Sequence, residues 1–280
     1  MTSPLAAAGA AGAASPAPLA LLHIPEQRSR LYSFLGNSLL RIMTADTAFG
    51  LEPDFWEAFG DAFALDAAGD SAADAHIEKA QADLQRVANE LKALERSVAI
   101  ERVGVEYTRL FVGPGTPAAP PWETLYREGG TVLFGLPTFD MRRLFGEQGY
   151  RASPESHQFE DHIGFELLYL ALRLSEAEGP AGGVEGPAKD ASRDSVAPTE
   201  DPAGAAANSA GLPLPPLATE IQEFIRTHPL SFIEKLHAKA SASCTAHPNS
   251  PGYYPALIEL AWGLLLQNAV MPQGCLAAAS

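Results

Sequence analysis

The chain has 280 residues, 46% of them apolar, which is enough to build one large hydrophobic core or two smaller ones. Its 34 acidic and 19 basic residues give a formal charge of -15, which argues against the basic face that nucleic-acid binding requires. The acidity would suit a cationic partner, although solubility is the commoner reason for such a charge.

Signals for export, membrane insertion and metal binding are missing. Residues 1–21 lack the charged and long apolar regions of an export signal, and no apolar run has the length of a membrane span. Cys244 and Cys275 are far from any C-x-x-C spacing, and the five-residue step from His157 to His162 does not suit two ligands on one helix face. We therefore expect a cytoplasmic protein without a metal or other cofactor, whose residues 1–21 form a disordered lead-in.

The first half of the chain predicts helices. The spacing of large apolar residues indicates one helix over Glu26–Met43 and a second over Asp54–Phe63. A long amphipathic helix is predicted over Ala72–Leu110, either continuous or broken near Gly104. Its apolar positions repeat every seven residues, with two intermediate positions also filled: Ile77, Leu84, Leu91 and Val98, then Val87 and Leu94.

The second half continues the helical pattern after an irregular loop at Val112–Pro121, where prolines and glycines forbid regular structure. Phe159–Glu178 is apolar nearly all round, as in a helix at the centre of a bundle. Residues 179–216 turn to Gly, Ala, Pro, Ser and Asp, which predicts a flexible linker or inserted loop. Three further helices are expected over Leu217–Arg226, Ser231–Ala240 and Tyr253–Val270. Since no run alternates as strands do, the predicted class is all-α.

Standard catalytic signatures are missing from the sequence. It has no G-x-x-x-x-G-K-[ST] phosphate loop, no G-x-G-x-x-G, no G-x-S-x-G and no H-E-x-x-H. The loop Gly113-Pro114-Gly115 suggests a nucleotide switch, but it has no lysine for phosphate and its proline removes an N–H donor. We predict that the protein is not an enzyme.

Two segments stand out from this helical background. In the first, which runs from Glu106 to Tyr126, a helix end leads into a proline-stiffened loop that carries Trp122. Its aromatic side chains either grip an apolar peptide or cover the end of the bundle. The second, Phe159–Leu167, opens the apolar helix, and Asp161 there either caps the helix or joins Glu160 and Glu166 in an anionic cluster that could receive guanidinium groups.

These segments resemble the TorD/DmsD family, the cytoplasmic maturation chaperones of molybdopterin enzymes. The resemblance lies in Tyr-Thr-Arg-Leu-Phe-Val-Gly-Pro-Gly at 107–115, Ala-Pro-Pro-Trp-Glu-Thr-Leu-Tyr at 119–126 and Glu-Asp-His-Ile-Gly-Phe-Glu-Leu at 160–167. It extends more weakly through Leu133-Phe134-Gly135 and His228-Pro229-Leu230-Ser231-Phe232, and so covers about Glu26 to Met271.

The resemblance implies a helical bundle of two parts, residues 22–178 and 217–280, joined by a hinge near the Asp-His motif and separated by the flexible acidic insert 179–216. It also implies binding of the twin-arginine signal peptide of a client enzyme. By match of motif, the signal-peptide groove would be formed by Tyr107, Leu110, Phe111, Pro121, Trp122, Tyr126, Asp161, His162 and Glu166.

The leading hypothesis is therefore a cytoplasmic chaperone that binds the signal peptide and the apo-form of a molybdopterin oxidoreductase of the dimethyl sulfoxide reductase family. It would assist cofactor insertion and delay export, with Leu110, Phe111 and Trp122 holding the apolar stretch of the peptide. Asp161, Glu166 and His162 would receive its arginines. The alternatives are a nitrate-reductase-type assembly chaperone and a non-enzymatic helical adaptor of another system. We expect a monomer, with a domain-swapped dimer as the alternative state.

Overall fold

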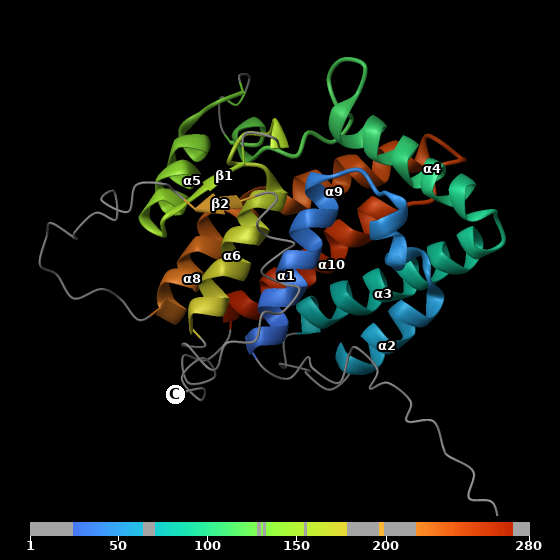
Figure 1. The fold of residues 1–280 in the computed structure, drawn as a ribbon, viewed down its shortest axis with the longest axis horizontal. Helices are drawn as coiled ribbons and strands as arrows, with labels where there is room; N and C mark the ends of the chain where they lie inside the picture. Colours follow the sequence, from blue (N-terminus) through green and yellow to red (C-terminus); the bar gives the residue numbers. More distant parts are fainter. Residues whose placement is uncertain are drawn as a thin grey trace, which may run out of the picture.

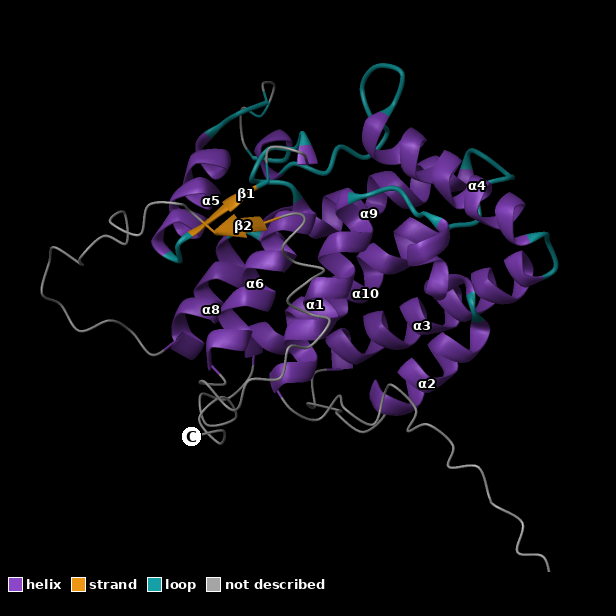
Figure 2. Ribbon diagram, in the orientation of Figure 1, coloured by secondary structure: helices purple, strands orange, loops and turns teal. Residues whose placement is uncertain are grey.

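The computed structural model describes residues 25–63, 71–127, 130, 133–153, 156–177, 196–198 and 217–270. The predicted lead-in and most of the predicted insert lie outside these residues. Within them the chain folds as a bundle of helices with one very short pair of strands at its edge, which confirms the all-α class (Figures 1 and 2).

The N-terminal helices follow the predicted pattern closely. Helix α1 spans Pro25–Leu40 and α2 spans Pro53–Phe63, with the 3-10 helix η1, Ala45–Leu51, between them. Leu31, Leu35 and Leu39 of the predicted apolar stripe are buried, while Ile42, beyond the end of α1, is exposed. Helix α1 packs along α6, Ile163–Ala177, over most of its length. Two helices from different parts of the chain, α1 and α6, thus pack together in the bundle.

The predicted long helix is in fact two helices, broken ten residues earlier than Gly104. Helix α3 spans Ser71–Lys92 and α4 spans Arg96–Tyr107, followed by the π-helical turn η2, Thr108–Val112. Glu95 starts α4, because its carboxylate accepts a hydrogen bond from Ser97 N at 3.3 Å. The break takes Val98 out of the seven-residue register, and its side chain is exposed to solvent. Gly104 lies inside α4.

Helix α5 and the paired strands were not predicted. Helix α5 spans Leu136–Glu147 and leads into strand β1, Tyr150–Ala152, which pairs antiparallel with β2, Val196–Pro198 (Figure 2). Strand β2 falls within the stretch predicted to be a flexible insert, and its Val196 is buried. These three residues thus take part in regular structure, while the flexibility of the insert stays a prediction.

The C-terminal helices are α8, Leu217–Thr227, α9, Pro229–Thr245, and α10, Tyr253–Val270, close to the three predicted spans. Helix α10 is buried on nearly every side, since it contacts α3, α9, α8, α4 and α1. Figure 1 shows α9 and α10 lying among helices of the first half of the chain. The two predicted parts thus share one core, while the hinge between them stays a prediction.

Candidate functional site

The first motif segment fastens the end of α4 to the start of α10. The buried carboxylate of Glu106 accepts hydrogen bonds from Ser250 Oγ at 2.5 Å, Gly252 N at 2.6 Å and Tyr254 N at 2.8 Å. Arg109 donates to the same loop, through Nη2 to Ser250 Oγ at 2.7 Å. Glu106 therefore satisfies backbone donors at the N-terminus of α10, which otherwise lack partners.

Three predicted groove residues of this segment belong to the core. Tyr107, Leu110 and Phe111 are at most 4% exposed. The rings of Tyr107 and Phe111 pack edge-on against Tyr254, at centroid distances of 5.2 and 5.4 Å. In the structure these three residues cover the end of the bundle, the second of the two roles considered for this segment.

The loop that follows is pinned to the start of α6. Trp122 and His162 form an antiparallel backbone bridge, flanked by hydrogen bonds from Ile163 N to Pro121 O and from Glu123 N to Asp161 O, both 2.9 Å. Tyr126 closes the loop on itself, since its hydroxyl donates to Pro120 O at 2.7 Å. The structure thus brings Pro121, Trp122, Asp161 and His162 together.

Asp161 accepts hydrogen bonds from the motif loop and from α5, and it does not cap α6. Its Oδ2 accepts from Thr124 N at 3.0 Å and Thr124 Oγ1 at 2.5 Å, while its Oδ1 accepts from Thr138 Oγ1 at 2.9 Å. The cap of α6 is His162, whose Nδ1 accepts from Gly164 N at 2.9 Å. Burial lowers the pKa of His162 to about 3, so the ring is neutral. Its remaining nitrogen, Nε2, lacks a hydrogen-bond partner among the described residues.

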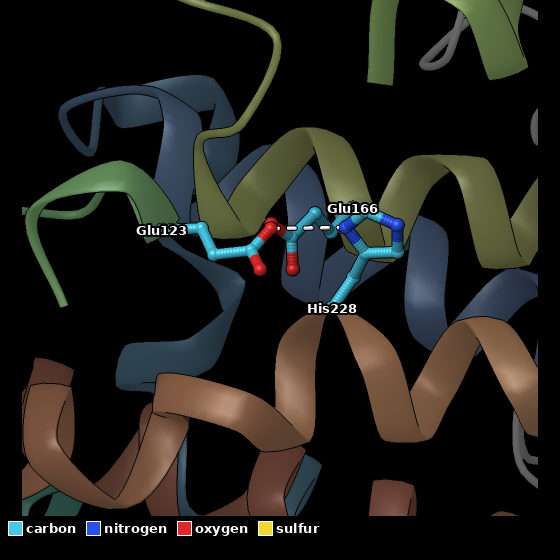
Figure 3. Close-up of side chains that lie close together, drawn as sticks. All are labelled: Glu123, Glu166 and His228. Carbon is cyan, nitrogen blue, oxygen red and sulfur yellow. Dashed lines mark hydrogen bonds and ion pairs between the residues drawn. The ribbon is translucent and has the colours of Figure 1, made fainter. Parts of the chain in front are cut away.

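Glu166 meets Glu123 and His228 in a buried polar cluster, and Figure 3 shows the three side chains converging from three segments. One oxygen of each carboxylate and a ring nitrogen of His228 all lie within 4.8 Å of one another. Glu123 accepts hydrogen bonds from Arg127 Nε at 2.6 Å, His228 Nδ1 at 2.9 Å and Ser231 Oγ at 3.2 Å. Neither carboxylate oxygen of Glu166 has a hydrogen-bond partner in the described part of the chain.

The two carboxyl groups of this cluster differ in their pKa values. Burial would raise the pKa of Glu123, but hydrogen bonds and charge from His228 and Arg127 outweigh it and lower the value. For Glu166, burial and then the neighbouring charges of Glu123 and Asp161 hold the pKa well above its ordinary range. The predicted anionic cluster is thus divided: Glu160 pairs with Arg142 at 2.8 Å, Asp161 is satisfied by threonines, and Glu166 faces inward.

A group of aromatic rings that includes Trp122 lies partly exposed on the surface, and it was not predicted as a site. Phe134 packs on Phe139 at a centroid distance of 4.9 Å and on Phe159 at 5.6 Å, and Phe159 packs on Trp122 at 6.4 Å. We call these four residues the aromatic surface. Phe134 and Phe139 are 41% and 49% exposed, and Leu136 beside them is 80% exposed. The stretch 133–135, quoted above for its resemblance, was the one signal in the sequence that pointed here.

The backbone of Phe134 adds a second unusual feature. Its φ of 71° lies in the left-handed region, which a bulky residue adopts only at a cost in free energy. The neighbouring Gly135 leaves no room for a side chain, because a Cβ there would lie 2.6 Å from Thr124 Cγ2. The surrounding structure therefore holds an exposed aromatic ring in a strained position.

Residues 71–196, which contain both motif segments, match the family model described as nitrate reductase delta subunit. This match and the relatives below confirm the resemblance to the TorD/DmsD family that the motif segments show in the sequence. The Tat proofreading chaperone DmsD of Salmonella typhimurium is 33% identical over 84 residues, which are 30% of this chain and 41% of that protein.

Two further relatives show the same extent of similarity. The probable Tat proofreading chaperone DmsD of Haemophilus influenzae is 30% identical over 76 residues, 27% of this chain and 37% of that protein. The chaperone protein TorD of a Psychrobacter species is 24% identical over 104 residues, 37% of this chain and 47% of that protein. The alignments thus span less than half the length of each of these relatives. Among the described helices, none has both the length and the apolar character needed to cross a bilayer.

Proposed function

We propose that the protein is a cytoplasmic chaperone, not an enzyme, which binds the twin-arginine signal peptide and the apo-form of a molybdopterin oxidoreductase of the dimethyl sulfoxide reductase family. It would assist cofactor insertion and delay export. The observation that carries the proposal is the aromatic surface, which includes the partly exposed Trp122 and lies within residues 71–196, the region that the family model matches.

The aromatic surface suits the apolar stretch of such a peptide. Rigid rings that are already exposed bind an apolar segment with little loss of conformational entropy. We propose that Trp122, Phe134 and Phe139 contact the peptide. Pro121 and Tyr126 hold the loop of Trp122, while Tyr107, Leu110 and Phe111 anchor the preceding turn in the core.

The arginines of the peptide require acidic partners. Asp161, His162 and Glu166 are at most 1% exposed, so they can receive a guanidinium group only if the Trp122 loop separates from α6. Such a separation would break two backbone hydrogen bonds of 2.9 Å and the two hydrogen bonds from Thr124 to Asp161, which makes it a local opening, not global unfolding. We propose that peptide binding is coupled to this opening.

Isothermal titration calorimetry with twin-arginine signal peptides of molybdoenzymes tests the proposal. Phe139→Ser and Phe134→Gly should each weaken binding about tenfold or more, which corresponds to about 1.4 kcal/mol. Phe134→Gly should keep the fold, because glycine accepts the left-handed backbone without strain. The control is Phe49→Ser, a residue of η1 that is 44% exposed and contacts Phe34 and Phe55. If no signal peptide binds, or if Phe49→Ser weakens binding equally, the proposal fails.

A second candidate is favoured by the description of the matching family, nitrate reductase delta subunit. In that case the client would be a nitrate reductase, and recognition would not depend on a cleaved export signal. Co-purification from cells that express the chain, followed by mass spectrometry of the bound protein, identifies the client and so distinguishes the two candidate functions. A client that still binds after its leader is deleted would favour the nitrate-reductase type.

A further inference from the structure

The buried cluster of Glu123, Glu166 and His228 is incomplete in its hydrogen bonding. Glu123 and Glu166 are 0% exposed and the His228 side chain is 12% exposed. Among the described residues, no donor reaches either oxygen of Glu166. Two ionised carboxylates side by side, with no donor at Glu166, are costly, so the site requires either a proton held between Glu123 and Glu166 or a cation.

The geometry points to a divalent-cation site of the zinc class formed by Glu123, Glu166 and His228. This inference does not rest on the proposed chaperone function. One imidazole nitrogen and two carboxylate oxygens are a donor set that zinc accepts, with a fourth position left for water. The three atoms lie within 4.8 Å of one another, and zinc–ligand distances of about 2.0–2.2 Å would bring them to about 3.4 Å apart, so the side chains would close around the ion.

The surroundings of the cluster favour zinc over calcium or magnesium. Calcium takes about six to eight oxygen ligands and magnesium keeps several waters, whereas this cluster is buried and offers a nitrogen. Arg127 pairs with one oxygen of Glu123 and leaves the other oxygen facing His228. The partly exposed Arg127 and His228 side chains mark the side from which an ion would enter.

A bound ion would connect three segments that are far apart in the sequence. Glu123 opens the short helix η3, Glu123–Leu125, directly after Trp122, Glu166 lies in the first turn of α6, and His228 precedes α9. Because these segments come from both halves of the chain, the ion would tie the motif loop to the junction of α8 and α9 (Figure 3). It would therefore raise the thermal stability of the full-length protein.

The test uses the full chain after removal of metals with a chelator. Zinc sulfate is titrated in a calorimeter, and calcium chloride serves as the contrasting ion. We expect one zinc per chain, no heat from calcium, and at least a tenfold loss of zinc affinity in Glu166→Gln and in His228→Asn. Glu166→Gln has nearly the same shape as glutamate, and circular dichroism verifies that both variants fold.

A second cluster provides the control. Glu259 contacts His76 Nδ1 at 2.7 Å and His237 Nε2 at 2.6 Å, so adventitious zinc could bind there. We expect His237→Ala to bind zinc as the unmodified chain does. X-ray absorption of the zinc-loaded chain should show nitrogen and oxygen ligands at about 2.0–2.2 Å and no sulfur at about 2.3 Å.

Three results would overturn the inference: no zinc binding by the unmodified chain, unchanged affinity in Glu166→Gln, or loss of binding in His237→Ala. A sulfur ligand in the absorption spectrum would equally contradict it, since the proposed site contains no cysteine. If the unmodified chain binds no zinc, a proton shared between the carboxyl groups of Glu123 and Glu166 occupies the site.

Discussion

At the scale of single residues, Asp161 illustrates how one side chain can organise a site. Its two oxygens accept three hydrogen bonds from Thr124 and Thr138, all of them buried. Asp161→Ala would leave those donors without partners, so we expect the free energy of unfolding to fall by about 3 kcal/mol. Urea denaturation followed by circular dichroism measures the change. The exposed Asp140→Ala is the control and should cost less than about 0.5 kcal/mol.

The hydrogen bond from Thr138 to Asp161 can be tested separately. Thr138→Val keeps the shape of the side chain and removes its hydroxyl donor, so it should cost about 1 kcal/mol alone. In a double-mutant cycle with Asp161→Ala, the two losses should overlap by about 1 kcal/mol, because both remove one interaction. Fully additive losses would contradict the assigned role of Asp161 as the link between the motif loop and α5.

At the scale of elements, the crossing of α1 and α6 depends on two glycines. A Cβ on Gly36 would lie 2.7 Å from Gly164 O, and a Cβ on Gly164 would lie 2.5 Å from Leu40 Cγ. Gly164→Ala should therefore destabilise the protein by about 2 kcal/mol through overpacking. Gly146→Ala in α5 has no atom within 4 Å of its Cβ and should stabilise by about 0.5–1 kcal/mol. Thermal melts of the two variants should move in opposite directions, and a shift of the same sign in both would contradict the close crossing.

The elements also show how far the sequence predicts this fold. Helix α10 begins and ends where its apolar stripe predicts, because burial on nearly all sides leaves a continuous signal. Helix α5 was missed since Leu136 and Phe139 face solvent while Met141 and Phe145 are buried, which blurs the period. The paired strands have three residues each, too few for an alternating pattern.

The site was harder to predict than the helices. The motif segments pointed to Trp122, Asp161 and His162, and the fold does bring these together. His228 lies 105 residues from Glu123 in the sequence, so no local spacing predicts their contact. Nor does periodicity fix where the Phe111 ring points, because Phe111 lies in the π-helical turn that follows α4.

At the scale of the whole molecule, a polar cluster around the buried carboxylate of Glu259 ties α3 and α9 to α10. Glu259 of α10 receives His76 of α3 at 2.7 Å and His237 of α9 at 2.6 Å, and Lys79 of α3 lies 3.4 Å away. Burial alone would raise the pKa of Glu259, but the hydrogen bonds from His237 and His76 and the charge of Lys79 outweigh it and lower the pKa to about 2. The carboxylate is thus charged wherever the bundle is folded near neutral pH.

This lowered pKa predicts how the stability of the bundle depends on pH. An acid whose pKa is lower in the folded state stabilises the protein above its unfolded pKa, and this stabilisation is lost as the pH falls toward the folded value. Glu259→Gln should therefore cost about 2 kcal/mol at about pH 7, and the difference from the unmodified chain should shrink as the pH falls below about 4. Urea denaturation of both chains across this range measures it. Glu90→Gln, which removes a surface pair with Arg86, should have little effect at any pH. If the cost of Glu259→Gln stays constant between about pH 7 and pH 3, the charge of Glu259 does not hold the three helices together.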